Sequence, residues 1–337
     1  AMPFFILAGQ IMNKSGITHR LVNFANVLVG HLRGGLAHAN IIASIFFAGM
    51  TGAAVSDTAA IGTMLIPAMV EDGYDKDFSA AVTAASSIIG PTIPPSNMMV
   101  IYGSLMGVSI AGLFAAGFIP GLLLGGMLMI LSGYISKKRG YPKKERRSTI
   151  KEMVVAFWDA ILALLMPVII LGGILSGVFT PTEAASIAVA YAFLVGKFVF
   201  KSLKLKDIPE LLEQTARTTG VVFLIIASAS ILGWILASER VPEQIAAMFL
   251  QISSNKYVIL LMINLLMLIV GMFMDIAAAL VILGPILHPL AVSIGVPPIQ
   301  FGIIMVLSLN VALMTPPVGA CLFVVSGITK LSLEQIS

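Results

Sequence analysis

Long apolar runs separated by short polar segments dominate the pattern of this chain. No charged residue occurs from Phe78 to Ser136 or from Ile276 to Thr329. Runs of that length exceed any soluble core helix, so they must contain membrane-spanning segments. We predict a helix end at 1–12, amphipathic surface helices at 17–33 and 241–253, and ordinary spans near 110–135, 155–176, 183–200 and 219–237.

Two pairs of shorter apolar arms predict helical hairpins. The first pair covers 36–50 and 57–70, and the second covers 257–271 and 276–290. Each arm has about 15 residues, or roughly 22 Å of helix, which is less than the roughly 30 Å thickness of the hydrocarbon layer. We therefore expect re-entrant hairpins that enter and leave the membrane on one side, with tips at 51–56 and 272–275.

Each hairpin is followed by an apolar segment that a proline cluster interrupts. The segment 78–104 is interrupted at 90–95, and the segment 299–326 is interrupted at 312–317. Proline removes a backbone donor and clashes with the preceding helical turn. Both segments are therefore predicted to be broken helices, each with two halves and an unwound centre.

The hairpin and the broken helix form a unit that occurs twice, 222 positions apart. Under that shift the chain-breaking residues coincide without a gap: Gly49-Met50 with Gly271-Met272, Gly62 with Gly284, Pro67 with Pro289, Gly73 with Gly295, and Pro94-Pro95 with Pro316-Pro317. One architecture used twice in a membrane protein is typical of a transporter. We divide the chain into a scaffold end and arm (1–35), repeat 1 (36–104), scaffold spans and a second arm (105–255) and repeat 2 (256–337).

Charge supports an inverted arrangement of the two repeats. Five predicted crossings separate the hairpins, and an odd number puts them on opposite sides of the membrane. If the first hairpin opens to the cytoplasm, all of the 20 Lys and Arg residues except Arg240 and Lys256 lie inside. This agrees with the positive-inside rule. The sequence thus predicts an all-α, multi-pass protein of the cytoplasmic membrane.

Composition excludes several other classes of protein. The chain of 337 residues is 58% hydrophobic and 11% charged, with a mean hydropathy of +1.01, whereas soluble domains carry about 25% charged residues. The single Cys321 excludes an intramolecular disulfide, the four histidines lack the spacing of a transition-metal site, and no Walker sequence indicates an ATPase. We predict no enzyme activity.

Unwound backbone in a membrane is tolerated only where it lines a cavity or binds something. Carbonyl oxygens at helix ends are hard ligands that suit Na⁺ and carry the negative end of a helix dipole. The alternative is that the breaks are packing kinks filled by neighbouring helices. The predicted sodium-binding positions are Ala48, Gly49, Thr51, Gly90, Ile93 and Pro95 in repeat 1, and Gly271, Asp275, Ala312, Thr315 and Pro317 in repeat 2.

Asp275 in the second predicted tip and Asp57, directly after the first, are the only acids that we place at the hairpin tips. A carboxylate inside a membrane is costly and indicates a function. For Asp275 we predict direct or water-mediated cation binding, whereas for Asp57 capping of the second arm is an equally good interpretation. A half-helix N-terminus would accept a substrate carboxylate, although each of these polar groups could instead satisfy the backbone. The predicted substrate-binding residues are Ser56, Asp57, Thr92, Ser96 and Asn97.

Two other polar features have structural interpretations. Thr180 to Glu183 has the composition of a capped helix start, with Thr as the cap, Pro at the first position and Glu three residues on. His288, in the second hairpin, is interpreted as a packed polar residue.

Four strings in the chain resemble the large membrane subunit of tripartite ATP-independent periplasmic (TRAP) transporters. They are HLRGGLAH at 31–38, FAGMTGAAVSD at 47–57, GPTIPPS at 90–96 and VFTPTEAA at 178–185. The resemblance runs through essentially the whole chain. Because the family is usually longer at both ends, we expect this chain to lack a first scaffold segment and a last span.

The resemblance implies a Na⁺-coupled importer of the ion-transporter superfamily with an elevator motion. It implies two protein partners, a periplasmic binding protein that delivers an organic acid and a small four-helix membrane subunit. It also implies Na⁺ as the coupling ion, bound at hairpin tips and unwound helices. C4-dicarboxylates, sialic acid and other small organic acids are all compatible substrates, since recognition belongs to a separate chain.

Three alternatives compete with this hypothesis. A stand-alone sodium–carboxylate symporter of the same superfamily would need no binding protein. An intramembrane aspartyl protease would need two adjacent carboxylates in a Gly-x-Gly-Asp context, which neither Asp57 nor Asp275 has. Closed hairpins that enter from both sides of the membrane suit a transporter with alternating access better than a channel.

Overall fold

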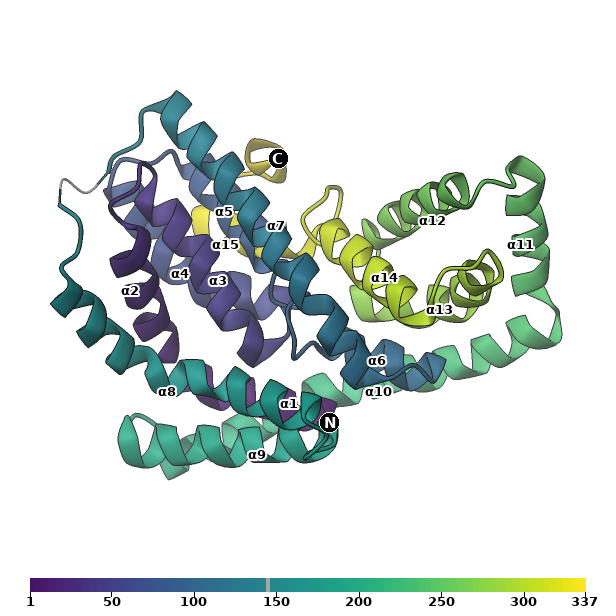
Figure 1. The fold of residues 1–337 in the computed structure, drawn as a ribbon, viewed down its shortest axis with the longest axis horizontal. Helices are drawn as coiled ribbons and strands as arrows, with labels where there is room; N and C mark the ends of the chain where they lie inside the picture. Colours follow the sequence, from purple (N-terminus) through teal and green to yellow (C-terminus); the bar gives the residue numbers. More distant parts are fainter. Residues whose placement is uncertain (144–145) are drawn as a thin grey trace.

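The computed structural model describes residues 1–143 and 146–337, apart from the side chains at 51, 233, 237 and 246, so Lys144 of the predicted cytoplasmic loop lies outside the described residues. All regular secondary structure in the described part is helical (Figure 1). The helices before the second repeat are α1 (Met2–Lys14), α2 (Ile17–Val29), α3 (Gly35–Thr51), α4 (Ala54–Glu71), α5 (Lys76–Ser87), α6 (Asn97–Met106), α7 (Ile110–Arg139), α8 (Ile150–Leu175), α9 (Pro181–Leu194), α10 (Ile208–Ser238) and α11 (Val241–Ile252). The remaining helices are α12 (Lys256–Gly271), α13 (Ile276–Ser293), α14 (Pro298–Ala312), α15 (Ala320–Thr329) and α16 (Leu333–Ile336).

The first hairpin consists of α3 and α4, which pack against each other. Its turn is shorter than the predicted segment 51–56, because Ala54 already begins α4. Gly52 turns the chain with a left-handed φ of 59°, and a Cβ on it would come within 2.7 Å of the Pro95 carbonyl oxygen. Only glycine combines that backbone conformation with so close an approach.

The second hairpin consists of α12 and α13, with its tip at 272–275 as predicted. The Asp275 side chain caps α13 by accepting a hydrogen bond from the Ala277 backbone N–H at 2.8 Å. Such a cap satisfies one of the free N–H groups at a helix start. The tip therefore ends in a defined helix start.

Both predicted broken helices are confirmed. The first consists of α5 and α6, separated by residues 88–96, and the second of α14 and α15, separated by 313–319. The Pro94–Pro95 and Pro316–Pro317 peptide bonds are both cis. Both breaks are longer than predicted, and the second ends at Gly319, whose φ is +48°.

The two repeats interlock. Each hairpin packs on its own broken helix, α3 and α4 on α5, and α12 and α13 on α14. In addition, α15 of the second repeat packs on α4 and α5, while α6 of the first packs on α13 and α14. Both breaks are thereby brought to the centre of the molecule, beside both tips.

The remaining helices surround this centre. The N-terminal helix α1 packs on α9, α10 and α3, and α8 packs on α2 and α9. Figure 1 shows α8, α9 and α10 along one edge of the molecule, with α11 and α12 at one end. A capping box of Thr180 and Glu183 begins α9, which confirms the predicted helix start.

Five helical segments of the described residues are long and apolar enough to cross a membrane: 110–139, 150–175, 181–199, 205–236 and 276–293. The first four overlap the predicted ordinary spans, and the fourth begins 14 residues before the predicted start at 219. The fifth is α13, three residues longer than the predicted arm, so the re-entrant course of this hairpin stays a prediction. Large apolar side chains such as Ile130, Trp158 and Trp234 are exposed on the outer helices, as expected of an integral membrane protein.

Candidate functional site

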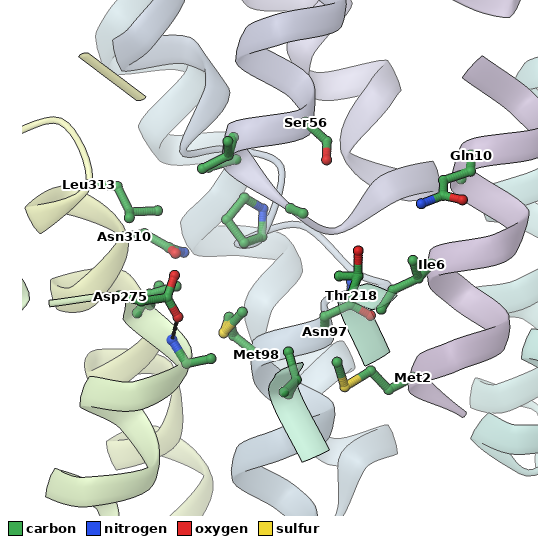
Figure 2. Close-up of a pocket in the computed structure, with 18 of the residues that line it drawn as sticks. Met2, Ile6, Gln10, Ser56, Asn97, Met98, Thr218, Asp275, Asn310 and Leu313 are labelled. Carbon is green, nitrogen blue, oxygen red and sulfur yellow. Dashed lines mark hydrogen bonds between the residues drawn. The ribbon is translucent and has the colours of Figure 1, made fainter. Parts of the chain in front are cut away.

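A cavity of about 390 Å³ lies where the two tips and the two breaks meet. Repeat 1 contributes the start of α4 and the start of α6, and repeat 2 contributes the start of α13 and the end of α14. The opposite wall comes from α1 and α10 (Figure 2). Segments from opposite ends of the sequence therefore enclose one central site.

Three helix N-termini face this cavity. They are the first turns of α4, α6 and α13, represented in the lining by Ser56, Asn97 and Ile276. Free N–H groups and the positive end of the helix dipole make such termini acceptors for anions. Asp275, which also lines the cavity, supplies the one carboxylate among the described lining residues.

Two of the predicted substrate-binding residues, Ser56 and Asn97, line the cavity. Thr92 and Ser96 do not line it and are fully buried. The Thr92 hydroxyl donates to the Ile88 carbonyl at 2.8 Å, and the Ser96 hydroxyl donates to the Pro91 carbonyl at 2.5 Å. Ser96 also caps α6. The interpretation that these groups satisfy the backbone of the break therefore fits their hydrogen bonds.

Asp57 does not line the cavity and is fully buried. The N-cap of α4 is Ala53, since the chain turns earlier than expected, and Asp57 lies in the first turn of that helix, near the positive end of its dipole. One carboxylate oxygen lies against Gly90, where any Cβ would overlap it. This carboxylate thus joins the first hairpin to the first break.

The predicted sodium positions of repeat 1 lie in different surroundings. Pro95 lies at the tip of the first hairpin, beside Gly52, and Gly90 lies beside Asp57. A Cβ on Gly49 would overlap Pro167 of α8, so this face of Gly49 is turned away from the break. Ala48 packs with Ile93 in one buried cluster. Thr51 ends α3, and its side chain lies outside the described residues.

The predicted sodium positions of repeat 2 also surround the junction of tip and break. A Cβ on Gly271 would lie 2.6 Å from the Ala312 Cβ, so the ends of α12 and α14 are in close contact. The Val318 N–H donates to the Met272 carbonyl at 3.2 Å, which fastens the tip to the break beside Pro317. The Thr315 hydroxyl donates to the Val311 carbonyl at 2.9 Å, a bond that does not use the lone pairs of its oxygen.

Asn310 is a lining residue that the sequence analysis missed. It is fully buried, and its Nδ2 donates to the Thr92 hydroxyl at 3.2 Å, whereas its Oδ1 accepts no hydrogen bond from the described residues. An amide in the middle of a long uncharged run was the available signal. Gln10, Asn13 and Thr218 of the opposite wall were also missed, because their place depends on how α1 and α10 pack.

His288 lies outside the cavity. Its Nδ1 is 2.6 Å from the Tyr102 hydroxyl, and its ring lies edge-on to the Tyr102 ring at a centroid distance of 5.7 Å. The interpretation of His288 as a packed polar residue is confirmed.

Several curated proteins are similar to the chain over its whole length. The sialic acid TRAP transporter large permease protein SiaM of Vibrio cholerae is 47% identical over 340 residues, covering 100% of this chain and 79% of that protein. The isethionate TRAP transporter permease protein DctMQ of Oleidesulfovibrio alaskensis is 46% identical, covering 100% of this chain and 53% of that protein. The C4-dicarboxylate TRAP transporter large permease protein DctM of Pseudomonas aeruginosa is 40% identical, covering 99% and 78%.

The family comparison agrees with these relatives. Residues 1–337 match the DctM component of the tripartite ATP-independent periplasmic transporter. The resemblance inferred from the four sequence strings is therefore confirmed, and the chain belongs to the DctM family of TRAP transporter large permeases.

Proposed function

We propose that this protein carries out Na⁺-coupled uptake of a small organic acid across the bacterial inner membrane. The observation that supports this most is the convergence of three helix N-termini on one central cavity. In a site without bulk water, such termini stabilise an anionic group, as in other secondary transporters. Ser56 and Asn97 supply polar side chains at two of these termini.

The coupling ions bind, in this proposal, where the opposite helix ends meet the breaks. The C-terminal ends of α3, α12 and α14 present carbonyl oxygens and negative dipole ends. The sites use Ala48, Gly49, Thr51, Gly90, Ile93 and Pro95 in repeat 1, and Gly271, Asp275, Ala312, Thr315 and Pro317 in repeat 2. Bound Na⁺ would then stabilise both tips around the anion, which couples the two ligands.

We also propose how the chain lies in the membrane, how it moves and which two proteins it works with. The two hairpins are re-entrant from opposite faces, and the interlocked repeats move as one elevator body against the scaffold. A periplasmic binding protein delivers the substrate, and a small membrane subunit braces the large one. The relatives named above bear the names of sialic acid, isethionate and C4-dicarboxylate transporters, all small organic anions, which fits a cavity lined by helix N-termini.

Uptake by proteoliposomes tests the proposal. Vesicles containing this protein and its small membrane subunit are loaded with K⁺ and diluted into Na⁺ with labelled sialic acid, a C4-dicarboxylate or isethionate. We expect accumulation of one substrate that requires both the Na⁺ gradient and the binding protein. Uptake without the binding protein would favour the stand-alone symporter. Accumulation that does not depend on the Na⁺ gradient would contradict Na⁺ coupling.

A further inference from the structure

A second, polar cavity of about 380 Å³ adjoins the central one. It is lined by Gln10, Asn13, Lys14, Leu211 and Gln214. Gln10 and Asn13 also line the central cavity, so the two spaces meet at these side chains. The polar residues of α1 recur three and four positions apart and share one face of that helix. Thr218 and Gln214 of α10, four positions apart, continue the same lining from one cavity to the other.

The amides at this junction present donors. The Thr215 hydroxyl lies 2.7 Å from the Leu211 carbonyl oxygen and 2.9 Å from the Gln10 Oε1, so its single proton is shared between these two acceptors. The Thr18 hydroxyl donates to the Asn13 Oδ1 at 3.0 Å. Both amide oxygens therefore have a partner, which leaves the two NH₂ groups to donate hydrogen bonds to a solute in the cavity. Figure 2 shows the Gln10 nitrogen on the side of the cavity.

Lys14 adds a positive charge at the outer end. Its ammonium lies 4.0 Å from the Glu210 carboxylate, and the two side chains are 45% and 60% exposed. An exposed pair at that distance is weak and exchanges readily with another anion. The positive-inside rule puts Lys14 on the cytoplasmic side.

We propose that Gln10, Asn13 and Lys14 form the release path by which the anionic substrate leaves the central cavity for the cytoplasm. This inference rests on the proposed function and adds to it the direction, the lining and the charge selectivity of the exit. The amide NH₂ groups replace part of the hydration of the leaving carboxylate or sulfonate. Lys14 then attracts the anion away from the helix N-termini, and the anion competes with the Glu210 carboxylate for the Lys14 ammonium.

Cysteine reactivity tests the release path without any transport measurement. Cys321 is buried and is the only cysteine of the chain, so Cys321→Ala gives a background free of thiols. Gln10→Cys, Asn13→Cys and Gln214→Cys are three reporters, and Leu7→Cys, on the apolar groove between α1, α9 and α10, is the matched control on α1. Each is treated with an anionic and a cationic methanethiosulfonate in right-side-out and inside-out vesicles, and rates are divided by those of a free thiol.

We expect the reporters, but not Leu7→Cys, to react from the cytoplasmic face. The anionic reagent should react about fivefold faster than the cationic one after normalisation, and Lys14→Gln should abolish that preference while Lys14→Arg retains it. Reaction from the periplasmic face only, or equal normalised rates for the two reagents, would overturn the release path. Since no Na⁺ gradient or substrate is involved, that failure is distinct from a failure of Na⁺-coupled uptake.

Discussion

Asn310 of the second repeat donates a hydrogen bond from its Nδ2 to the Thr92 hydroxyl of the first repeat at 3.2 Å. Both side chains are fully buried, and the bond joins the end of α14 to the first break. Asn310 also lines the central cavity. The relative position of the two breaks, and hence the shape of the site, therefore depends on this contact between the repeats.

Replacing Asn310 with Ala should impair function more than stability. The change removes the bond to Thr92 and a lining amide, at a cost of about 1 kcal/mol in the free energy of unfolding. We expect a several-fold higher Na⁺ concentration for half-maximal uptake. Asn264→Ala is the matched control, because Asn264 bonds Ser308 between α12 and α14 at 2.5 Å and does not line the cavity. Equal uptake defects in the two variants would remove Asn310 from the site.

Asp275 has two separable roles, a cap and a charge. Asp275→Asn keeps an oxygen for the Ala277 N–H but removes the charge, whereas Asp275→Ala removes both. We expect both variants to express and to lose Na⁺-driven uptake, and only the Ala variant to lose about 1 kcal/mol of stability. Tm and uptake, measured on the same preparations, separate the roles. Normal Na⁺ dependence in the Asn variant would reduce Asp275 to a cap.

Gly90 is predicted to be intolerant of any side chain. A Cβ there would overlap the Asp57 carboxylate, so Gly90→Ala should cost about 1–3 kcal/mol and displace the first break. Gly126→Ala on α7 is the control, because a Cβ at Gly126 meets open space and should be neutral or stabilising. Thermal unfolding in detergent, followed by uptake, measures both. A Gly90→Ala protein with normal Tm would show that the overlap is relieved cheaply.

The architecture was predictable because backbone chemistry marks it locally. Short apolar arms and proline clusters placed both hairpins and both breaks, glycine and proline coincidences 222 positions apart showed that the unit is repeated, and the capping box at Thr180 and Glu183 was recognisable from composition. Such residues act through their own φ angles or missing donors. Their effect therefore does not depend on which helix packs against them.

The side chains of the site were less predictable, because their roles depend on packing and on single residues of register. Asp275 is the N-cap of α13, whereas Asp57 lies in the first turn of α4 and is buried against Gly90. The difference arises at Gly52, which turns the chain in fewer residues than expected. Asn310, Gln10 and Thr218 come from helices far apart in sequence, and nothing local marks them as neighbours.

The loop between α4 and α5 should make stability depend on pH. The Tyr141 hydroxyl donates to Asp75 Oδ2 at 2.7 Å and Arg139 donates to the same oxygen at 2.9 Å, and these two bonds hold the pKa of Asp75 below its usual value. A lowered pKa in the folded state stabilises the fold above the unfolded pKa of about 3.9, and that stabilisation is lost as pH falls through the folded pKa.

Tyr141→Phe removes the larger cause of this shift. We expect a lower Tm than wild type at pH 7 and a difference that shrinks below about pH 4. The effect is small, because the Asp75 side chain is 56% exposed. Tyr134→Phe, at an exposed tyrosine of α7, is the control and should match wild type at every pH. A Tm difference that stays constant with pH would assign the Tyr141 contribution to its packing with Tyr74 and Phe78.

Equilibrium binding of radioactive Na⁺ to the purified full-length protein tests the central claim most directly, because it needs no partner subunit and no known substrate. We predict saturable binding that excess K⁺ does not displace, that Asp275→Asn weakens by an order of magnitude or more, and that Asn264→Ala leaves unchanged. Absence of saturable binding, or binding that is the same in Asp275→Asn, would contradict a sodium site at the meeting point of the two tips and the two breaks.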